Sequence, residues 1–170
     1  VKGHALVTVD DKKVFEVTIS NVRYEQNANF AVPTSAEVTI FANPFTTTIK
    51  LTKETAERFL FDFAFRSPQG CTTALRANVK LSSGNYDSFA TFEEAVENIN
   101  VLAIQNDFQV VAKMDVKSVH SLGKRIGDLT VEELNTYTKA ELYKNASKVA
   151  DVRFEKENGK QEVYFIFSDG

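Results

Sequence analysis

"VRFEKENGKQEVYFIFSDG", residues 152–170, carries the clearest fold signal in the chain. Apolar residues alternate with polar ones on both sides of the pair Asn158-Gly159. Alternation with a period of two is typical of a strand that buries one face, and Asn-Gly favours the type I′ turn that joins two antiparallel strands. The stretch therefore predicts a β-hairpin at the end of the chain.

The same alternation recurs through the first half of the chain. Residues 4–22 contain two such runs around a turn-type cluster at residues 10–13. Residues 36–52 contain two more, separated by an Asn-Pro pair, and residues 72–83 contain one. The β-branched residues Thr, Val and Ile are frequent in these runs, as is usual in strands. The first half is therefore predicted to be mostly antiparallel sheet.

One helix is predicted within this half, over residues 53–65, "KETAERFLFDFAF". Thr52 is a suitable N-cap because its hydroxyl can accept a hydrogen bond from a free backbone N–H. Apolar side chains then recur at the spacing of one buried helical face. Because Phe61 and Phe65 lie outside that face, the predicted helix is apolar around more than half its girth and should lie between two layers. The face consists of Ala56, Phe59, Leu60, Phe63 and Ala64.

Capping boxes, Thr-x-x-Glu, predict helices in the second half. The box at residues 91–94 would start a helix whose apolar face continues to Ala103. Boxes at residues 130–133 and 138–141 predict two short helices in succession. Residues 107–117 fit both a strand and a helix, and their alternation favours the strand.

These elements predict an α+β protein. Residues 1–84 would form an antiparallel, β-rich subdomain, sandwich-like in architecture, that carries the one apolar helix. Residues 85–170 would form an α+β subdomain that ends in the β-hairpin. The composition changes near residue 84 without a Pro-rich linker, so the two parts are expected to pack together as one compact unit.

Composition narrows the class of protein. The chain has 170 residues, a formal net charge of −3 and a pI near 5.5. No nucleic-acid partner is expected, because such proteins usually carry a basic stripe and a high pI. No transmembrane segment is expected either, because no apolar run approaches the roughly 18 residues of a membrane-spanning helix. Cys71 is the one cysteine, so it forms no internal disulfide and is expected to be a small buried residue at a strand edge.

The segment 118–130, "SVHSLGKRIGDLT", resembles a functional loop because it combines a histidine, two adjacent cations and two glycines. It departs from the phosphate-binding P-loop pattern, which requires Gly, four residues and then Gly-Lys-Ser/Thr. Gly123 and Gly127 are expected to supply positive φ angles at a helix exit and a turn. Lys124 and Arg125 are expected to be solvated. The segment is therefore interpreted as a connection.

The segment from Tyr24 to Ser35 is predicted to be a long loop and is the preferred ligand-binding candidate. Its aromatic rings could stack on a sugar ring while its amides pair with hydroxyls. The alternative is that the rings turn inward and plug the core. No catalytic residue, metal site or cofactor site is predicted. The candidate ligand-binding residues are Tyr24, Gln26, Asn27, Asn29 and Phe30.

The sequence of the second half also resembles that of a known group of proteins. Thr- and Asn-rich strands lead into residues 128–155, "DLTVEELNTYTKAELYKNASKVADVRFE", and the chain closes with "VYFIFSDG". Over residues 75–170 this resembles uncharacterised exported lipoproteins of gut Bacteroidetes. The resemblance implies a periplasmic or cell-surface location and no assigned activity. We also expect a signal peptide or lipoprotein leader to precede Val1, with any lipid anchor attached upstream of that residue.

Together these observations predict a non-catalytic exported protein of the cell envelope, a binding or structural module for a glycan or protein partner. One alternative is a hydrolase whose carboxylates, or His120 and Cys71, meet only in the fold. Another is a protein inhibitor or assembly component that uses a free sheet edge, for which residues 163–167 are the candidate strand.

Overall fold

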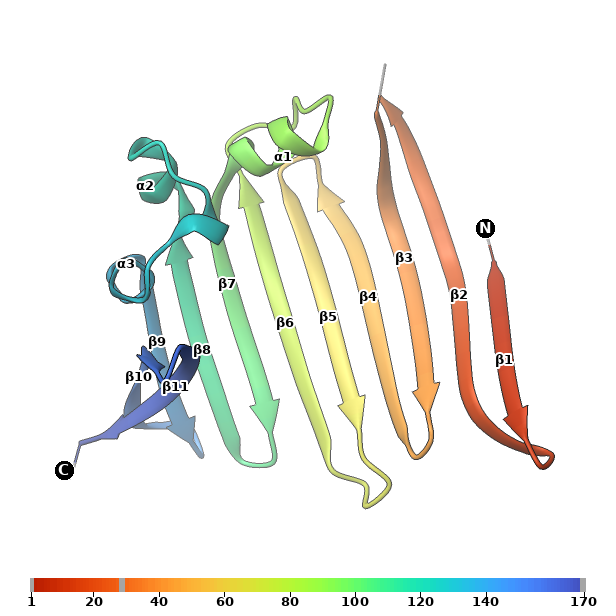
Figure 1. Ribbon diagram of the computed structural model, residues 1–170. Coiled ribbons are helices and arrows are strands. Elements are labelled where there is room, and N and C mark those ends of the chain that lie inside the picture. Colours follow the sequence, from red (N-terminus) through yellow and green to blue (C-terminus); the bar gives the residue numbers. More distant parts are fainter. Residues whose placement is uncertain (1, 28–29, 169–170) are drawn as a thin grey trace.

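The computed structural model describes residues 2–27 and 30–168. Over these residues the chain forms one antiparallel sheet of 11 strands, and each strand pairs with the strands next to it in sequence (Figure 1). The strands are β1 (Gly3–Val9), β2 (Lys12–Asn27), β3 (Phe30–Ala42), β4 (Phe45–Thr55), β5 (Arg58–Arg66), β6 (Thr72–Leu81), β7 (Val96–Gln105), β8 (Phe108–Asp115), β9 (Thr138–Lys144), β10 (Ser147–Glu157) and β11 (Lys160–Phe167).

The helices are short and gather at one end of the sheet. α1 (Phe89–Ala95) connects β6 to β7, and α2 (Val116–Ser121), the 3-10 helix η1 (Ile126–Asp128) and α3 (Val131–Tyr137) connect β8 to β9. Because β6 and β8 run in the same direction, all four segments lie beyond the same end of the sheet, which we call the helix end (Figure 1).

The antiparallel, β-rich structure predicted for the first half is confirmed. The α+β class is not confirmed, because the second half also consists mostly of strands of the same sheet, and the helix predicted at residues 53–65 is wrong. These residues form the end of β4, a tight turn and most of β5. Phe61 of β5 lies opposite Leu51 of β4 and Ala77 of β6, so the strand is paired on both sides. The sheet has no second layer of strands in the described residues, so the sandwich-like arrangement is not confirmed.

The capping-box predictions had mixed outcomes. The box at Thr130 and Glu133 is confirmed and starts α3. The helix expected to begin at Thr91 starts instead after Ser88, whose side chain forms a capping box with Thr91, and ends at Ala95. Thr138 begins β9 rather than a helix. The strand favoured for residues 107–117 is confirmed as β8.

The turn predictions rest on backbone angles. Asn158 and Gly159 both have positive φ, as a type I′ turn requires, which confirms the final hairpin. Asp10 and Asp11 do the same between β1 and β2. Gly123 has the expected positive φ after α2, whereas Gly127 lies within η1 and does not.

The boundary expected near residue 84 falls in the connection that holds α1. β6 and β7, which precede and follow that connection, are paired neighbours from Thr73 opposite Gln105 to Leu81 opposite Val96. The sheet therefore runs without a break from the first half of the chain into the second.

Strand register places most apolar side chains on one side of the sheet, which we call the apolar face. A single row across ten neighbouring strands shows this, because residues directly opposite each other in a sheet share a face. From β2 to β11 the row reads Ile19, Val38, Ile49, Phe63, Leu75, Ala103, Val110, Leu142, Ala150 and Phe167.

The buried core occupies only parts of this face. One cluster lies at the helix end, where Phe59 and Val79 pack with Tyr86 and with Val116 of α2. A second, smaller cluster lies where β9 and β10 pair and includes Leu142. The remainder of the apolar face has no covering layer in the described residues.

Candidate functional site

The uncovered part of the apolar face is the most distinctive surface of the molecule. Eight of its large side chains are each between 37% and 45% exposed, and Val163 and Phe167 of β11 are 55% and 53% exposed, which is unusual for apolar residues on one face of a sheet. They extend from β2 to β11. The eight residues are Phe15, Ile19, Phe45, Ile49, Phe61, Phe63, Phe108 and Phe165.

The total surface area is consistent with an open sheet. The chain exposes 11171 Å². A compact monomer of 19.0 kDa is expected to expose about 8,400 Å², roughly 2,800 Å² less. Contiguous apolar patches on soluble monomers are usually no larger than about 300–600 Å², and larger ones mark interaction sites. The apolar face is therefore a candidate binding surface.

The sheet curls toward its apolar face at the C-terminal side. Thr73 of β6 and Phe165 of β11 line the same hollow, which has a volume of about 320 Å³. In a flat sheet these strands would lie about 24 Å apart. The apolar face is therefore concave here, and the hollow is largely apolar. Its other lining residues are Ala103, Ile104, Gln105, Phe108, Val110 and Leu142.

Asn135 of α3 holds the start of this curl in place. β10 pairs with β9 only as far as Val152 opposite Ala140. Beyond that point the Asn135 side chain accepts a hydrogen bond from the backbone N–H of Phe154 (2.9 Å) and donates one to its carbonyl (2.7 Å). Asn135 thus satisfies backbone groups that would have faced Thr138 of β9 if the pairing had continued, and β10 can leave the plane of the sheet.

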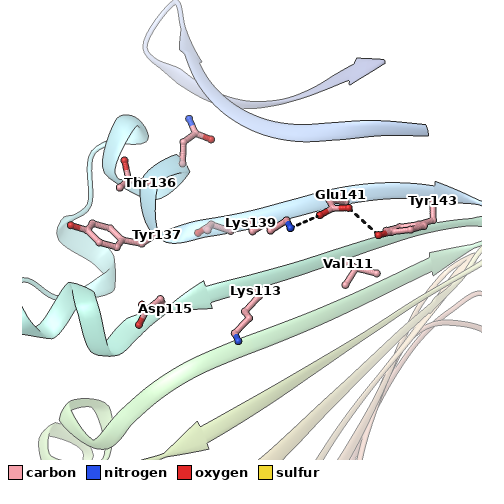
Figure 2. Close-up of a pocket in the computed structure, with 10 residues that line it drawn as sticks. Val111, Lys113, Asp115, Thr136, Tyr137, Lys139, Glu141 and Tyr143 are labelled. Carbon is pink, nitrogen blue, oxygen red and sulfur yellow. Dashed lines mark hydrogen bonds and ion pairs between the residues drawn. The ribbon is translucent and has the colours of Figure 1, made fainter. Parts of the chain in front are cut away.

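A second hollow, of about 500 Å³, lies on the polar side of β8 and β9 beside α3 (Figure 2). Its central carboxylate is Glu141, which accepts a hydrogen bond from the Tyr143 hydroxyl (2.9 Å) and lies 3.1 Å from the Lys139 ammonium. The hydrogen bond from Tyr143 and the ion pair with Lys139 lower the pKa of Glu141, and the same hydrogen bond raises the pKa of Tyr143.

The two carboxylates of this hollow do not form a catalytic pair. Glu141 lies opposite Val111, and Asp115 is four residues further along β8, so strand geometry separates them by about 14 Å. Paired carboxyls of glycosidases lie about 5–9.5 Å apart, and the general acid needs a raised pKa. Here hydrogen bonds from Ser118 lower the pKa of Asp115, and the pKa of Glu141 is lowered as well.

His120 and Cys71 do not meet. His120 lies in α2 at the helix end, whereas Cys71 lies in the turn between β5 and β6 at the opposite end of the sheet (Figure 1). The Cys71 thiol is partly buried and accepts a hydrogen bond from the Gln105 amide at 3.3 Å. The described residues contain no group of three or more His, Cys, Asp or Glu side chains that could hold a metal ion.

The basic loop connects α2 to α3, and its cations are accessible to solvent as expected, with the Lys124 and Arg125 side chains 39% and 67% exposed. Both cations also have a carboxylate partner. Lys124 forms an ion pair with Glu133 of α3. Arg125 forms two hydrogen bonds with Glu93 of α1, which lower the pKa of that carboxyl. His120 and Glu93 line the same hollow, of about 430 Å³. The loop therefore ties the helices to one another.

The segment predicted to be a binding loop is largely strand. Tyr24, Gln26 and Asn27 belong to the end of β2 and pair with Pro33, Ala31 and Phe30 of β3. Tyr24 is 58% exposed, so its ring does not plug the core. Asn29 lies outside the described residues. Sugar binding by this set stays a prediction.

The sequence reasoning missed the apolar face, although a signal for it was present. Phe59, Phe61, Phe63 and Phe65 alternate strictly, and they were assigned to a helix rather than to a strand. Counting the alternation in every run would have shown more apolar strand faces than the expected single helix could cover.

Comparisons of the chain with protein-family models, with curated proteins and with solved structures gave no match. Among the described residues no helix is long and apolar enough to cross a membrane.

Proposed function

We propose that this protein is a non-catalytic, exported binding module that holds the hydrophobic part of its partner on the apolar face. The observation that carries this proposal is the set of half-exposed apolar side chains that β2, β4, β5, β8 and β11 place on one face of the sheet. The resemblance of residues 75–170 to envelope lipoproteins supports the exported location.

The geometry of the polar groups supports a binding role rather than a hydrolytic one. The carboxylates of the larger hollow are too far apart to act as an acid–base pair, and both have lowered pKa values. His120 and Cys71 occupy opposite ends of the sheet.

The apolar face suits a hydrophobic partner better than a glycan. A glycan needs hydrogen-bonding groups beside each aromatic ring, whereas Phe63 has Ile49 and Leu75 directly opposite it on the neighbouring strands. Covering a ring that is 40% exposed, as Phe108 is, removes roughly 80 Å² of apolar surface, or about 2 kcal/mol before the costs of association. Several such rings together could sustain tight binding.

The test is the binding of a neutral hydrophobic dye, N-phenyl-1-naphthylamine, followed by fluorescence. The wild-type protein should give a saturable increase, and the double variant Phe61→Ser with Phe63→Ser should weaken binding about tenfold or more. Both side chains lie on the apolar face and are 37% exposed, so their loss should leave the fold intact.

The matched control is Ala64→Ser, which lies on the same strand but faces the polar side. Circular dichroism and thermal melting establish that each variant is folded. Equal dye binding by the wild-type protein and the folded double variant would contradict the proposal, and so would the absence of any saturable signal.

A further inference from the structure

The concave end of the apolar face contains a hollow. It lies away from the helices, where β6 begins and β7 and β9 end, and Phe165 of β11 lies over it. Its volume of about 320 Å³ is near the lower limit of ligand pockets, about 300–1,000 Å³. The size suits one slender molecule rather than a protein surface.

The apolar lining continues from the hollow along the sheet. Ala103, which lines the hollow, lies opposite Leu75 of β6, and Leu75 lies opposite Phe63 of β5. A flexible chain that enters the hollow can therefore continue along this row and keep apolar contact. A compact ring system could fill the hollow but would not use the row.

One cation stands at the rim of the hollow. Lys144, the last residue of β9, lies opposite Phe108 and shares its face of the sheet. Its ammonium is 5.3 Å from the centroid of the Phe108 ring, and Phe108 lines the hollow. Such exposed cation–π contacts are weak and leave the ammonium hydrogens free to donate.

Lys144 has no carboxylate partner among the described residues, unlike Lys53, Lys124 and Lys148. The next residue, Asn145, donates a backbone hydrogen bond to the carbonyl of Asp107 in the turn between β7 and β8. The side chain of Gln105, at the same end of the hollow, donates to Cys71. The charge at the rim is thus one unpaired positive group beside an apolar cavity.

We propose that the hollow takes the alkyl chain of a single-chain anionic amphiphile, a long-chain carboxylate, whose head group pairs with the Lys144 ammonium. This inference rests on the proposed function, because it places the ligand on the apolar face. The positive charge of Lys144 favours an anionic head group. The hollow and the apolar row that leads away from it favour an extended alkyl chain. A lone lysine matches a monoanion, since it supplies one point charge.

The experiment measures displacement of N-phenyl-1-naphthylamine by dodecanoate and by dodecyltrimethylammonium, each below its micelle-forming concentration. Dodecanoate should displace the dye from the wild-type protein at a concentration about tenfold lower than the cationic amphiphile does. Lys144→Gln should weaken dodecanoate about fivefold to tenfold and leave the cationic amphiphile unchanged or strengthened. Acetate should not displace the dye, because it has no chain to bury.

Two variants keep the outcome decisive. Lys160→Gln removes an exposed lysine from the polar side of β11 and should change nothing. Ala103→Phe fills the hollow and should abolish dodecanoate binding without lowering the melting temperature of the protein.

The inference is overturned if both amphiphiles bind equally to the wild-type protein, or if Lys144→Gln and Lys160→Gln behave alike. In either case dye binding would persist, and the proposed function would stand without the anionic ligand. If neither the dye nor any amphiphile binds, the proposed function fails together with the inference.

Discussion

The two ends of strand β5 differ sharply although their sequence pattern is the same. Phe59, at the helix end, is 2% exposed and makes edge-on contacts with the rings of Tyr86 and Phe92. Phe61 and Phe63, further along the same strand and on the same face, are each 37% exposed. The difference lies in the cover: the loop before α1 and α1 itself supply Tyr86 and Phe92, and no described segment covers the rest of the strand.

This contrast shows that alternation identifies which face of a strand is apolar but not whether that face is buried. A phenylalanine on this face is a core residue at the helix end, as Phe59 is, and a surface residue further along the strand, as Phe63 is. Stability should therefore depend on one end of the sheet, and binding on the other.

Removing one ring from each end of β5 should destabilise the protein to very different extents. Phe59→Ala should lower the free energy of unfolding by about 3–5 kcal/mol, because it leaves a cavity among packed rings. Phe63→Ala should lower it by less than about 1.5 kcal/mol, because that ring is already partly in water. Urea denaturation measures both. Equal losses would mean that the open part of the face is covered in solution.

A second prediction concerns how the curl is held. Asn135→Ala should lower the free energy of unfolding by about 1–3 kcal/mol, because the backbone N–H and carbonyl of Phe154 lose their partners. Amide hydrogen exchange of Phe154 and the β11 strand should accelerate. The control is Asn100→Ala, because the Asn100 side chain donates a hydrogen bond to the Asn98 side chain and to no backbone group among the described residues. Unchanged exchange in the Asn135 variant would show that the hairpin curls without this bridge.

The ion pair between Glu93 and Arg125 at the helix end should have the smallest effect on stability. The hydrogen bonds from Arg125 hold the pKa of Glu93 below its ordinary value of 4.5. A carboxyl with a lowered folded-state pKa contributes stability above its unfolded pKa, and that contribution is lost as the pH falls through the folded value. Wild type should therefore melt slightly above Glu93→Gln at neutral pH, and the gap should close as the pH drops below 4.5. Melting temperature against pH measures this, and a gap that widens in acid would contradict it.

The wrong helix at residues 53–65 has a physical explanation. Residues four apart share a face both in a helix and in a strand, so Phe59 and Phe63 fit either structure. Phe61 and Phe65 distinguish the two, because they share the strand face but fall off the helical stripe. Pairing with β4 on one side and β6 on the other then stabilises the strand, and these partners lie outside any local window.

The candidate site was harder to predict than the fold. The prediction at Tyr24 rests on aromatic and amide side chains that lie close together in sequence, which is a local feature. The hollow draws on Thr73 of β6 and Phe165 of β11, which lie far apart in sequence. Such a surface depends on the order of the strands and on the curl of the sheet, so no short sequence motif predicts it.

Short stretches of sequence account for the turns, the helix caps and the apolar face of each strand. Asn158-Gly159 makes its turn, Thr130 and Glu133 make their cap, and alternation separates an apolar face from a polar one, because each depends on residues only a few positions apart. The tertiary structure alone decided which end of that face is covered, where β10 leaves β9, and that Arg125 pairs with Glu93. These outcomes depend on contacts between distant segments, and the energies of such contacts exist only once the strands have paired.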